Sequence, residues 1–237
     1  MLDKGTKTMG GTGHPSTPIT ADFVARWEPS YDTRKYPVDF YLNCTASARQ
    51  AKSPENLKDV LLAVLHWKDG KALSFVPGEI HAKNLGPILM LNGAALAEFA
   101  QLFLTLVEAT DDNLRERAAG LRKTLAVMWN SVVMPAFVLH VARPDRLPII
   151  DQHTMRAFLY LTRARFVAKP AIRSWDLCSD YTAFFERAVV HAGFAFDFAS
   201  RCCVDRALFA YGKWLEEAYP REKEKLLNKR ALRDGIA

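Results

Sequence analysis

The chain of 237 residues has few cysteines, and their spacing builds no metal site. Cys44, Cys178, Cys202 and Cys203 include no Cys-x-x-Cys pair, which argues against a zinc site or an iron–sulfur cluster. We therefore expect no metal and no cofactor. Unpaired thiols, and a start without an apolar leader, predict a cytoplasmic protein.

Long uninterrupted apolar runs are also missing. The most apolar stretch, residues 124–142, is broken by Asn130, Ser131, Pro135 and His140, each of which is costly in lipid. We interpret this stretch as buried helix and His140 as a hydrogen-bonded core residue. No membrane partner is expected.

Acidic residues are outnumbered, 26 Asp and Glu against 32 Lys and Arg, so the formal charge is +6. The surplus is concentrated between Asn113 and Arg173, where eleven basic residues face three acids. Charge gathered in one stretch is typical of a surface that binds a polyanion. Solvated helix faces are the alternative explanation.

Strand patterns are nearly absent, whereas apolar residues recur at helical spacing from Ser53 onward. Ser53 and Pro54 mark a helix start, and Ser174 begins a helix that Gly193 closes. A further helix is expected to stop at Pro220, and residues 221–233 are expected to form a separate, charged and solvated helix. We predict an all-α bundle, with residues 1–22 as a flexible tail and 23–237 as one domain.

The most informative stretch is residues 134–162, MPAFVLHVARPDRLPIIDQHTMRAFLYLT. An apolar helix leads through a basic, proline-containing turn to Ile149 and Ile150, and then Asp151, Gln152 and His153 open a new helix. This order resembles the end of the helix–hairpin–helix DNA glycosylase signature, in which a loop delivers an apolar-Asp-x-His sequence to a helix start.

The resemblance implies a two-lobed helical bundle with a cleft between the lobes and a hairpin-like segment at about 111–165. It implies that Asp151 is catalytic and that double-stranded DNA is the partner. Cleavage of an N-glycosidic bond passes through an oxocarbenium-like state, which a fixed carboxylate stabilises. The expected reaction removes a modified or damaged base and leaves an abasic site, in repair or in defence against modified phage DNA.

Two departures from the family pattern refine this expectation. Residues 129–133 replace the Gly-x-Gly hairpin that would bind a DNA phosphate through backbone amides. Basic side chains are therefore expected to contact phosphates instead; the candidates are Arg122, Lys123, Arg143, Arg146 and Arg156. Val133 stands where bifunctional members carry a Schiff-base lysine, so we predict hydrolysis without lyase activity.

A glycosylase also needs a pocket for the extruded base, with aromatic faces and a few polar groups. Such residues occur at the end of the first long helix, in the hairpin position and after Asp151. The candidates are Trp67, Lys68, Trp129, Asn130, Gln152 and His153.

Each assignment has a simpler alternative. Asp151 between a turn and an apolar helix is also a good N-cap, and the two roles are compatible. The whole chain could be a non-catalytic all-α module that binds DNA, or an interaction protein with no nucleic-acid role.

Overall fold

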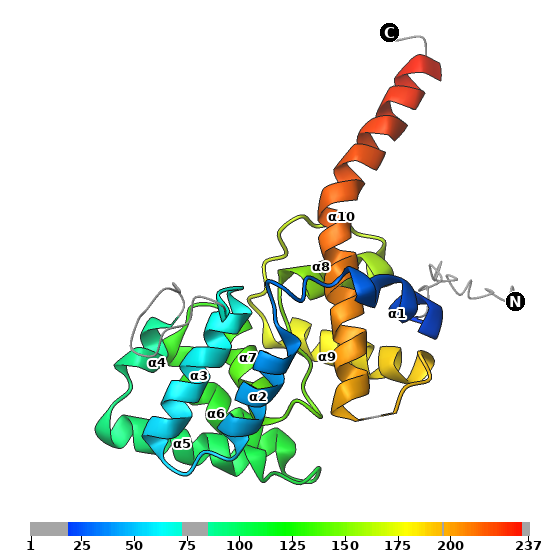
Figure 1. The fold of residues 1–237 in the computed structure, drawn as a ribbon. Coiled ribbons are helices and arrows are strands. Elements are labelled where there is room, and N and C mark those ends of the chain that lie inside the picture. The colour runs from blue at the N-terminus through cyan, green and yellow to red at the C-terminus, as the bar shows by residue number, and fades with distance from the viewer. Residues whose placement is uncertain (1–18, 73–84, 196, 234–237) are drawn as a thin grey trace, which may run out of the picture.

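The computed structural model describes residues 19–72, 85–195 and 197–233, and side chains as far as residue 219 (Figure 1). These residues contain helices and no strand, which confirms the all-α class. The helices are α1 (Ala21–Trp27), a 3-10 turn η1 (Glu28–Ser30), α2 (Val38–Arg49), α3 (Pro54–Lys68), α4 (Gly86–Met90), α5 (Gly93–Val107), α6 (Leu114–Met128), α7 (Val133–Ala142), α8 (Gln152–Arg163), α9 (Trp175–His191) and α10 (Phe198–Arg233).

The local start and stop signals of two helices operate as predicted. The Ser53 hydroxyl accepts a hydrogen bond from the Asn56 amide (3.1 Å), which caps α3. The Ser174 hydroxyl caps α9 in the same way, by accepting from the Asp176 amide (3.1 Å). Gly193 follows α9 with φ +72°, a left-handed conformation that glycine adopts without strain.

Other boundaries differ from the prediction. The break at Pro220 was wrong: residues 221–233 are helical as predicted, but they continue α10 without interruption and project from the body (Figure 1). An interior proline costs about 3 kcal/mol but does not forbid a helix. Ile19 is only 2% exposed and Thr20 caps α1, so the described chain includes the last four residues of the predicted tail; residues 1–18 lie outside it.

The helices enclose two hydrophobic cores. Leu61, Phe103 and Phe137 belong to the first, which α2, α3, α4, α5, α6 and α7 build. Met155 and Phe185 belong to the second, which α1, α8, α9 and α10 build. Figure 1 shows the two groups side by side, with α7 next to the second group. The connection from α7 to α8 thus passes from one core to the other.

Helix α8 is held tightly against α10. A Cβ atom added at Gly212 would lie 1.9 Å from the carbonyl oxygen of His153, so only glycine permits this approach. The Arg156 side chain is fully buried beside it and donates to the Gly212 carbonyl (2.7 Å). These contacts fix the first turn of α8, and therefore the position of Asp151.

Within the described residues, no helix is both long and apolar enough to cross a membrane.

Candidate functional site

Lys68 and Asp151 form an ion pair between the last residue of α3 and the N-cap of α8. The Lys68 Nζ lies 3.0 Å from Asp151 Oδ2, and the two side chains are only 9% and 13% exposed. The ammonium also lies 5.2 Å from the centre of the Phe137 ring on α7. A cation over an aromatic face is attracted by the ring quadrupole. Three helices therefore hold the pair.

The two carboxylate oxygens of Asp151 have different partners. Oδ1 accepts hydrogen bonds from the amides of His153 (2.8 Å) and Thr154 (2.9 Å). The Thr154 hydroxyl accepts from the Asp151 amide (3.0 Å), which completes a capping box. Oδ2 is left for Lys68. The capping role is therefore real, and it uses Oδ1 while Oδ2 pairs with Lys68.

Asp151 is a carboxylate at neutral pH. Burial raises its pKa, but the Lys68 ammonium, His153 and the Thr154 amide more than offset this and hold the pKa below its usual value. The Asp151 side chain is largely covered by neighbouring protein groups, so its negative charge lies among fixed partners rather than in bulk water. Such a fixed charge stabilises developing positive charge better than a solvated one.

Asp151 and Lys68 line a hollow of ≈ 830 Å³, here called the Asp151 pocket. Its walls come from the end of α3, the α6–α7 connection, the start of α8 and residues 170–173. Four of the six predicted pocket residues line it: Lys68, Trp129, Asn130 and Gln152. The structure thus brings together residues that the sequence separates by more than 80 positions.

The two other predicted pocket residues face elsewhere. Trp67 is 4% exposed, stacks on Tyr41 and donates its indole N–H to the Pro37 carbonyl (3.0 Å), so it belongs to the core. The His153 ring turns towards α10, 4.7 Å from the centre of the Phe209 ring. Helical spacing explains both corrections: each residue neighbours one that lines the pocket, and adjacent helical residues point about 100° apart.

Two of the predicted phosphate contacts are structural arginines. Arg156 is 0% exposed; its Nε donates to the Ala168 carbonyl (3.0 Å), and its Nη2 pairs with Glu216 (3.1 Å). Arg143 is buried and makes two hydrogen bonds to the Asp145 carboxylate (3.0 and 2.8 Å). Because these donors are already used, neither arginine is placed to bind a phosphate.

The other three predicted phosphate contacts reach solvent. Arg146 is exposed but pairs with Asp111 (2.7 Å). Arg122 and Lys123 are exposed on α6, and the Arg122 guanidinium lies 5.1 Å from the centre of the Trp175 ring. The sequence interpretation missed Arg173, which lines the Asp151 pocket. Arg173 belongs to residues 163–173, a segment that contains basic residues and no Asp or Glu, and this pattern could have indicated it.

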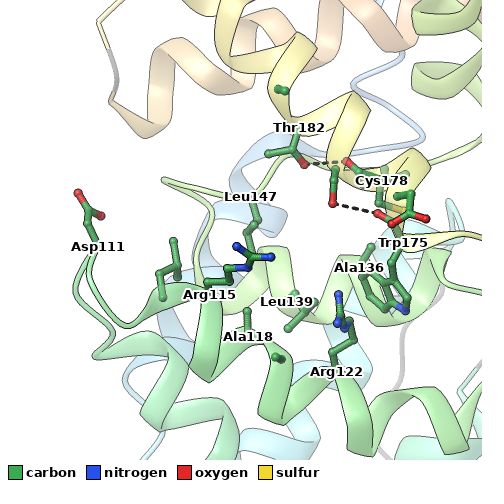
Figure 2. A pocket seen from close by; sticks show the side chains of 16 residues that line it. Asp111, Arg115, Ala118, Arg122, Ala136, Leu139, Leu147, Trp175, Cys178 and Thr182 are labelled. Carbon is green, nitrogen blue, oxygen red and sulfur yellow. Dashed lines mark hydrogen bonds between the residues drawn. The ribbon is translucent and has the colours of Figure 1, made fainter.

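A second hollow, of ≈ 680 Å³, lies between α6 and α9. Figure 2 shows Arg115 and Arg122 on α6 facing Cys178 and Thr182 on α9. Aliphatic side chains of α7 and of the α7–α8 connection form its floor. Arg122 is the only predicted site residue among those lining it.

Two buried titratable groups lie beneath the site. His140 donates from Nδ1 to the Leu147 carbonyl (2.5 Å) and accepts from the Tyr41 hydroxyl, which confirms its predicted core role. Burial lowers its pKa to about 3. Asp205 on α10 was missed by the sequence interpretation; burial and the Asp151 charge raise its pKa to about 8, despite the opposing charge of Lys68. The apolar residues around it in the sequence, Val204, Ala207 and Leu208, are buried, and this pattern could have indicated that Asp205 is buried too.

Among the described residues, no three His, Cys, Asp or Glu side chains are grouped to hold a metal ion. The chain matches no protein-family model, no curated protein and no solved structure, so the site is interpreted from its own geometry.

Proposed function

We propose that this protein is a monofunctional DNA glycosylase. It flips a modified or damaged base into the Asp151 pocket, hydrolyses the N-glycosidic bond and leaves an abasic site. The observation that carries the proposal is the Asp151 carboxylate: it is ionised, fixed by a helix cap and open to a pocket that contains Trp129, Asn130 and Gln152. No metal or cofactor is required.

The pocket suits a single nucleotide. Small-molecule sites are typically hollows of about 300–1,000 Å³, and the Asp151 pocket falls in this range at ≈ 830 Å³. An extruded base is held by stacking and by hydrogen bonds to its polar edge. Trp129 supplies an aromatic face, and the amides of Asn130 and Gln152 supply both donors and acceptors.

The chemistry follows from the ion pair. As the bond to the base breaks, positive charge develops on the sugar, and Asp151 Oδ2 stabilises it electrostatically. The base leaves with the electron pair of the broken bond, water adds its oxygen to the sugar carbon, and the proton that this water loses ends on the departed base. Lys68 holds Oδ2 in place and, as a cation, is suited to donate a hydrogen bond to the departing base. Lys68 is thus both a positioning residue and a substrate contact.

The arrangement of the helices supports the same proposal. Helices α6 and α7, joined by residues 129–132, precede the connection that delivers Asp151 to α8. This is the order of elements in a helix–hairpin–helix glycosylase, and the two cores correspond to two lobes. We propose that the Asp151 pocket is part of the cleft between them. Base-excision repair and defence against modified phage DNA, in the cytoplasm, are the roles that this activity would serve.

Lys68 also favours a second candidate function, a glycosylase with lyase activity. An amine 3.0 Å from the catalytic carboxylate is placed where a nucleophile would attack the sugar. In that reaction the amine displaces the base and forms an imine, which borohydride reduces to a stable adduct. We favour hydrolysis because Lys68 Nζ donates a hydrogen bond to Asp151 Oδ2 (3.0 Å), which directs the amine to the carboxylate rather than to the sugar. An adduct that disappears in Lys68→Gln would establish the second candidate.

The decisive experiment measures base release. The protein is incubated with duplexes carrying a panel of modified bases and with phage DNAs, and alkali-labile abasic sites are counted. Asp151→Asn should abolish base release while DNA binding persists, because Asn keeps the shape and loses the charge. Asp59→Asn, an exposed carboxylate on α3, is the matched control and should react at the wild-type rate.

Three outcomes would lead to different conclusions. Base release by Asp151→Asn at the wild-type rate would refute the mechanism. Tight DNA binding without release of any base would favour the non-catalytic DNA-binding module. No binding to DNA at any salt concentration would favour an interaction protein without a nucleic-acid role.

A further inference from the structure

The connection between α8 and α9 carries cations without acids. Residues 163–173 contain Arg163, Arg165, Lys169 and Arg173 and no Asp or Glu. All four are exposed, and Arg163 pairs with Asp180 (3.4 Å). The other three have no ion-pair partner among the residues that the structure describes. Their charge is therefore available to a partner.

This connection is held from beneath by the buried Arg156. The Arg156 Nε donates to the carbonyls of Val167 (3.3 Å) and Ala168 (3.0 Å), and its Nη2 also bonds the Ala168 carbonyl. Further along, Ile172 is buried in the second core. The backbone on both sides of Lys169 is thus fixed. An ordered loop loses less entropy on binding than a free one.

The same connection forms one wall of the Asp151 pocket. Residues 170–173 line it, and Arg173 stands at its edge. Two residues later, Trp175 begins α9 and contacts the Arg122 guanidinium on α6, as Figure 2 shows. Arg122, Arg165, Lys169 and Arg173 are here called the basic rim. Arg173 lines the Asp151 pocket, Arg165 and Lys169 lie on the connection that leads to the pocket wall at residues 170–173, and Arg122 lines the adjacent hollow. The acids that line the two hollows are Asp69 and Asp151 in the Asp151 pocket and Asp111 and Asp176 in the second hollow.

We infer that the basic rim binds the DNA backbone beside the extruded nucleotide. This inference rests on the proposed function and names the surface through which the site holds its substrate. Exposed Lys and Arg side chains without base-reading geometry position a protein on phosphates, independently of sequence. The inference also explains why Arg143 and Arg156 are not needed as phosphate contacts: Arg156 acts through the loop that it supports.

The test compares two triple variants that remove the same charge. Arg165→Gln/Lys169→Gln/Arg173→Gln alters the rim, and Arg34→Gln/Lys52→Gln/Arg187→Gln alters exposed cations elsewhere. Binding to a 30-bp duplex is measured by fluorescence anisotropy over a range of salt concentrations. The logarithm of the binding constant falls with the logarithm of the salt concentration, and each lost phosphate contact reduces the magnitude of this negative slope by about 0.9. We expect the magnitude of the slope to fall by about 2–3 in the rim variant and by less than about 1 in the control variant.

A third variant separates charge from shape. Arg165→Lys/Arg173→Lys keeps the charge, so its slope should match that of the wild type. Circular dichroism of all variants establishes that they are folded. A wild-type slope in the rim variant, or an equal loss in the control, would overturn the inference. Binding to phosphatidylserine vesicles but not to DNA would also overturn it.

The experiment distinguishes this inference from the proposed function. Base release by the wild type with an unchanged slope in the rim variant refutes the rim alone. Rim-dependent DNA binding without release of any base refutes the glycosylase alone.

Discussion

Lys68 Nζ lies 3.0 Å from Asp151 Oδ2, although 83 residues separate them in the chain. The pair joins the last residue of α3, a helix of the first core, to the N-cap of α8, a helix of the second. Loss of one partner from a buried ion pair leaves an unpaired charge in the protein interior. The pair therefore holds Asp151 in position and stabilises the contact between the cores.

We predict that Lys68→Met destabilises the protein by about 3–5 kcal/mol, the cost of an unpaired buried charge. Asp151→Asn in the same background should restore part of this loss, because no charge is then left unpaired. Urea unfolding of the two single variants and the double variant measures the coupling. Additive effects would contradict a direct interaction. Lys68→Arg, which keeps the charge, is the control and should lose less.

The same substitution should change the pH dependence of base release. The pKa of Asp151 lies below its usual value because Lys68, His153 and the Thr154 amide outweigh burial. Without Lys68, burial has less opposition and the pKa rises. The acidic limb of the rate profile in Lys68→Met should therefore move to higher pH. An unmoved limb would show that Asp151 is not the titrating group.

Gly212→Ala should destabilise the protein by about 1–3 kcal/mol or more, as overpacking does. The new Cβ would lie 1.9 Å from the His153 carbonyl oxygen, so α8 and α10 must separate. Gly120→Ala on α6 is the matched control: its Cβ would meet only Leu102, at 3.8 Å. That variant should be more stable by up to about 1 kcal/mol, from helix propensity. Thermal unfolding compares them, and equal effects would contradict the close approach.

The raised pKa of Asp205 predicts a fall in stability as the pH rises from about 4 to about 8. Its pKa is raised from 3.8 to about 8, so the folded protein keeps a proton that the unfolded chain has lost. The stabilisation that comes from this bound proton is complete below pH 3.8, declines as the pH rises, and is lost once the pH has risen through 8. His140, with a pKa of about 3, acts in the opposite sense, but only below pH 6.5. Between pH 6.5 and 8 the Asp205 effect is therefore unopposed by His140.

Asp205→Asn should flatten the stability profile in that window. The wild type should lose up to about 1.4 kcal/mol per pH unit from this group. Denaturant midpoints at pH 6.5, 7.25 and 8 measure the slope. An identical slope in the variant would show that Asp205 is ionised in the folded protein.

Ala164→Gly should stabilise the protein by about 0.5–1 kcal/mol. Ala164 follows α8 with φ +46°, a left-handed conformation that costs a residue with a Cβ about 1–2 kcal/mol; greater freedom of glycine in the unfolded chain offsets part of the gain. Ala168→Gly, in the same connection but without a positive φ, is the control and should be neutral or destabilising. Denaturant unfolding measures both. A loss of stability in Ala164→Gly would contradict the assigned backbone conformation.

Local features could be predicted wherever a residue acts on its own neighbours. Ser53 and Ser174 cap their helices as expected because a hydroxyl needs an amide only two or three residues away. Asp151 was identified as a helix start for the same reason. Pro220 was misjudged because its cost is moderate and the rest of a helix can absorb it.

The sequence by itself determined the all-α class, the helix caps, the stretch that carries the basic surplus and the prominence of Asp151. Only the tertiary structure decided which charges are free. It paired Lys68 with Asp151, buried Arg156 beneath the connection after α8, and placed Trp67 in the core while Trp129 lines the pocket. The physical reason is distance: capping and periodicity act over a few residues, whereas burial and ion pairing depend on helices that meet from distant parts of the chain.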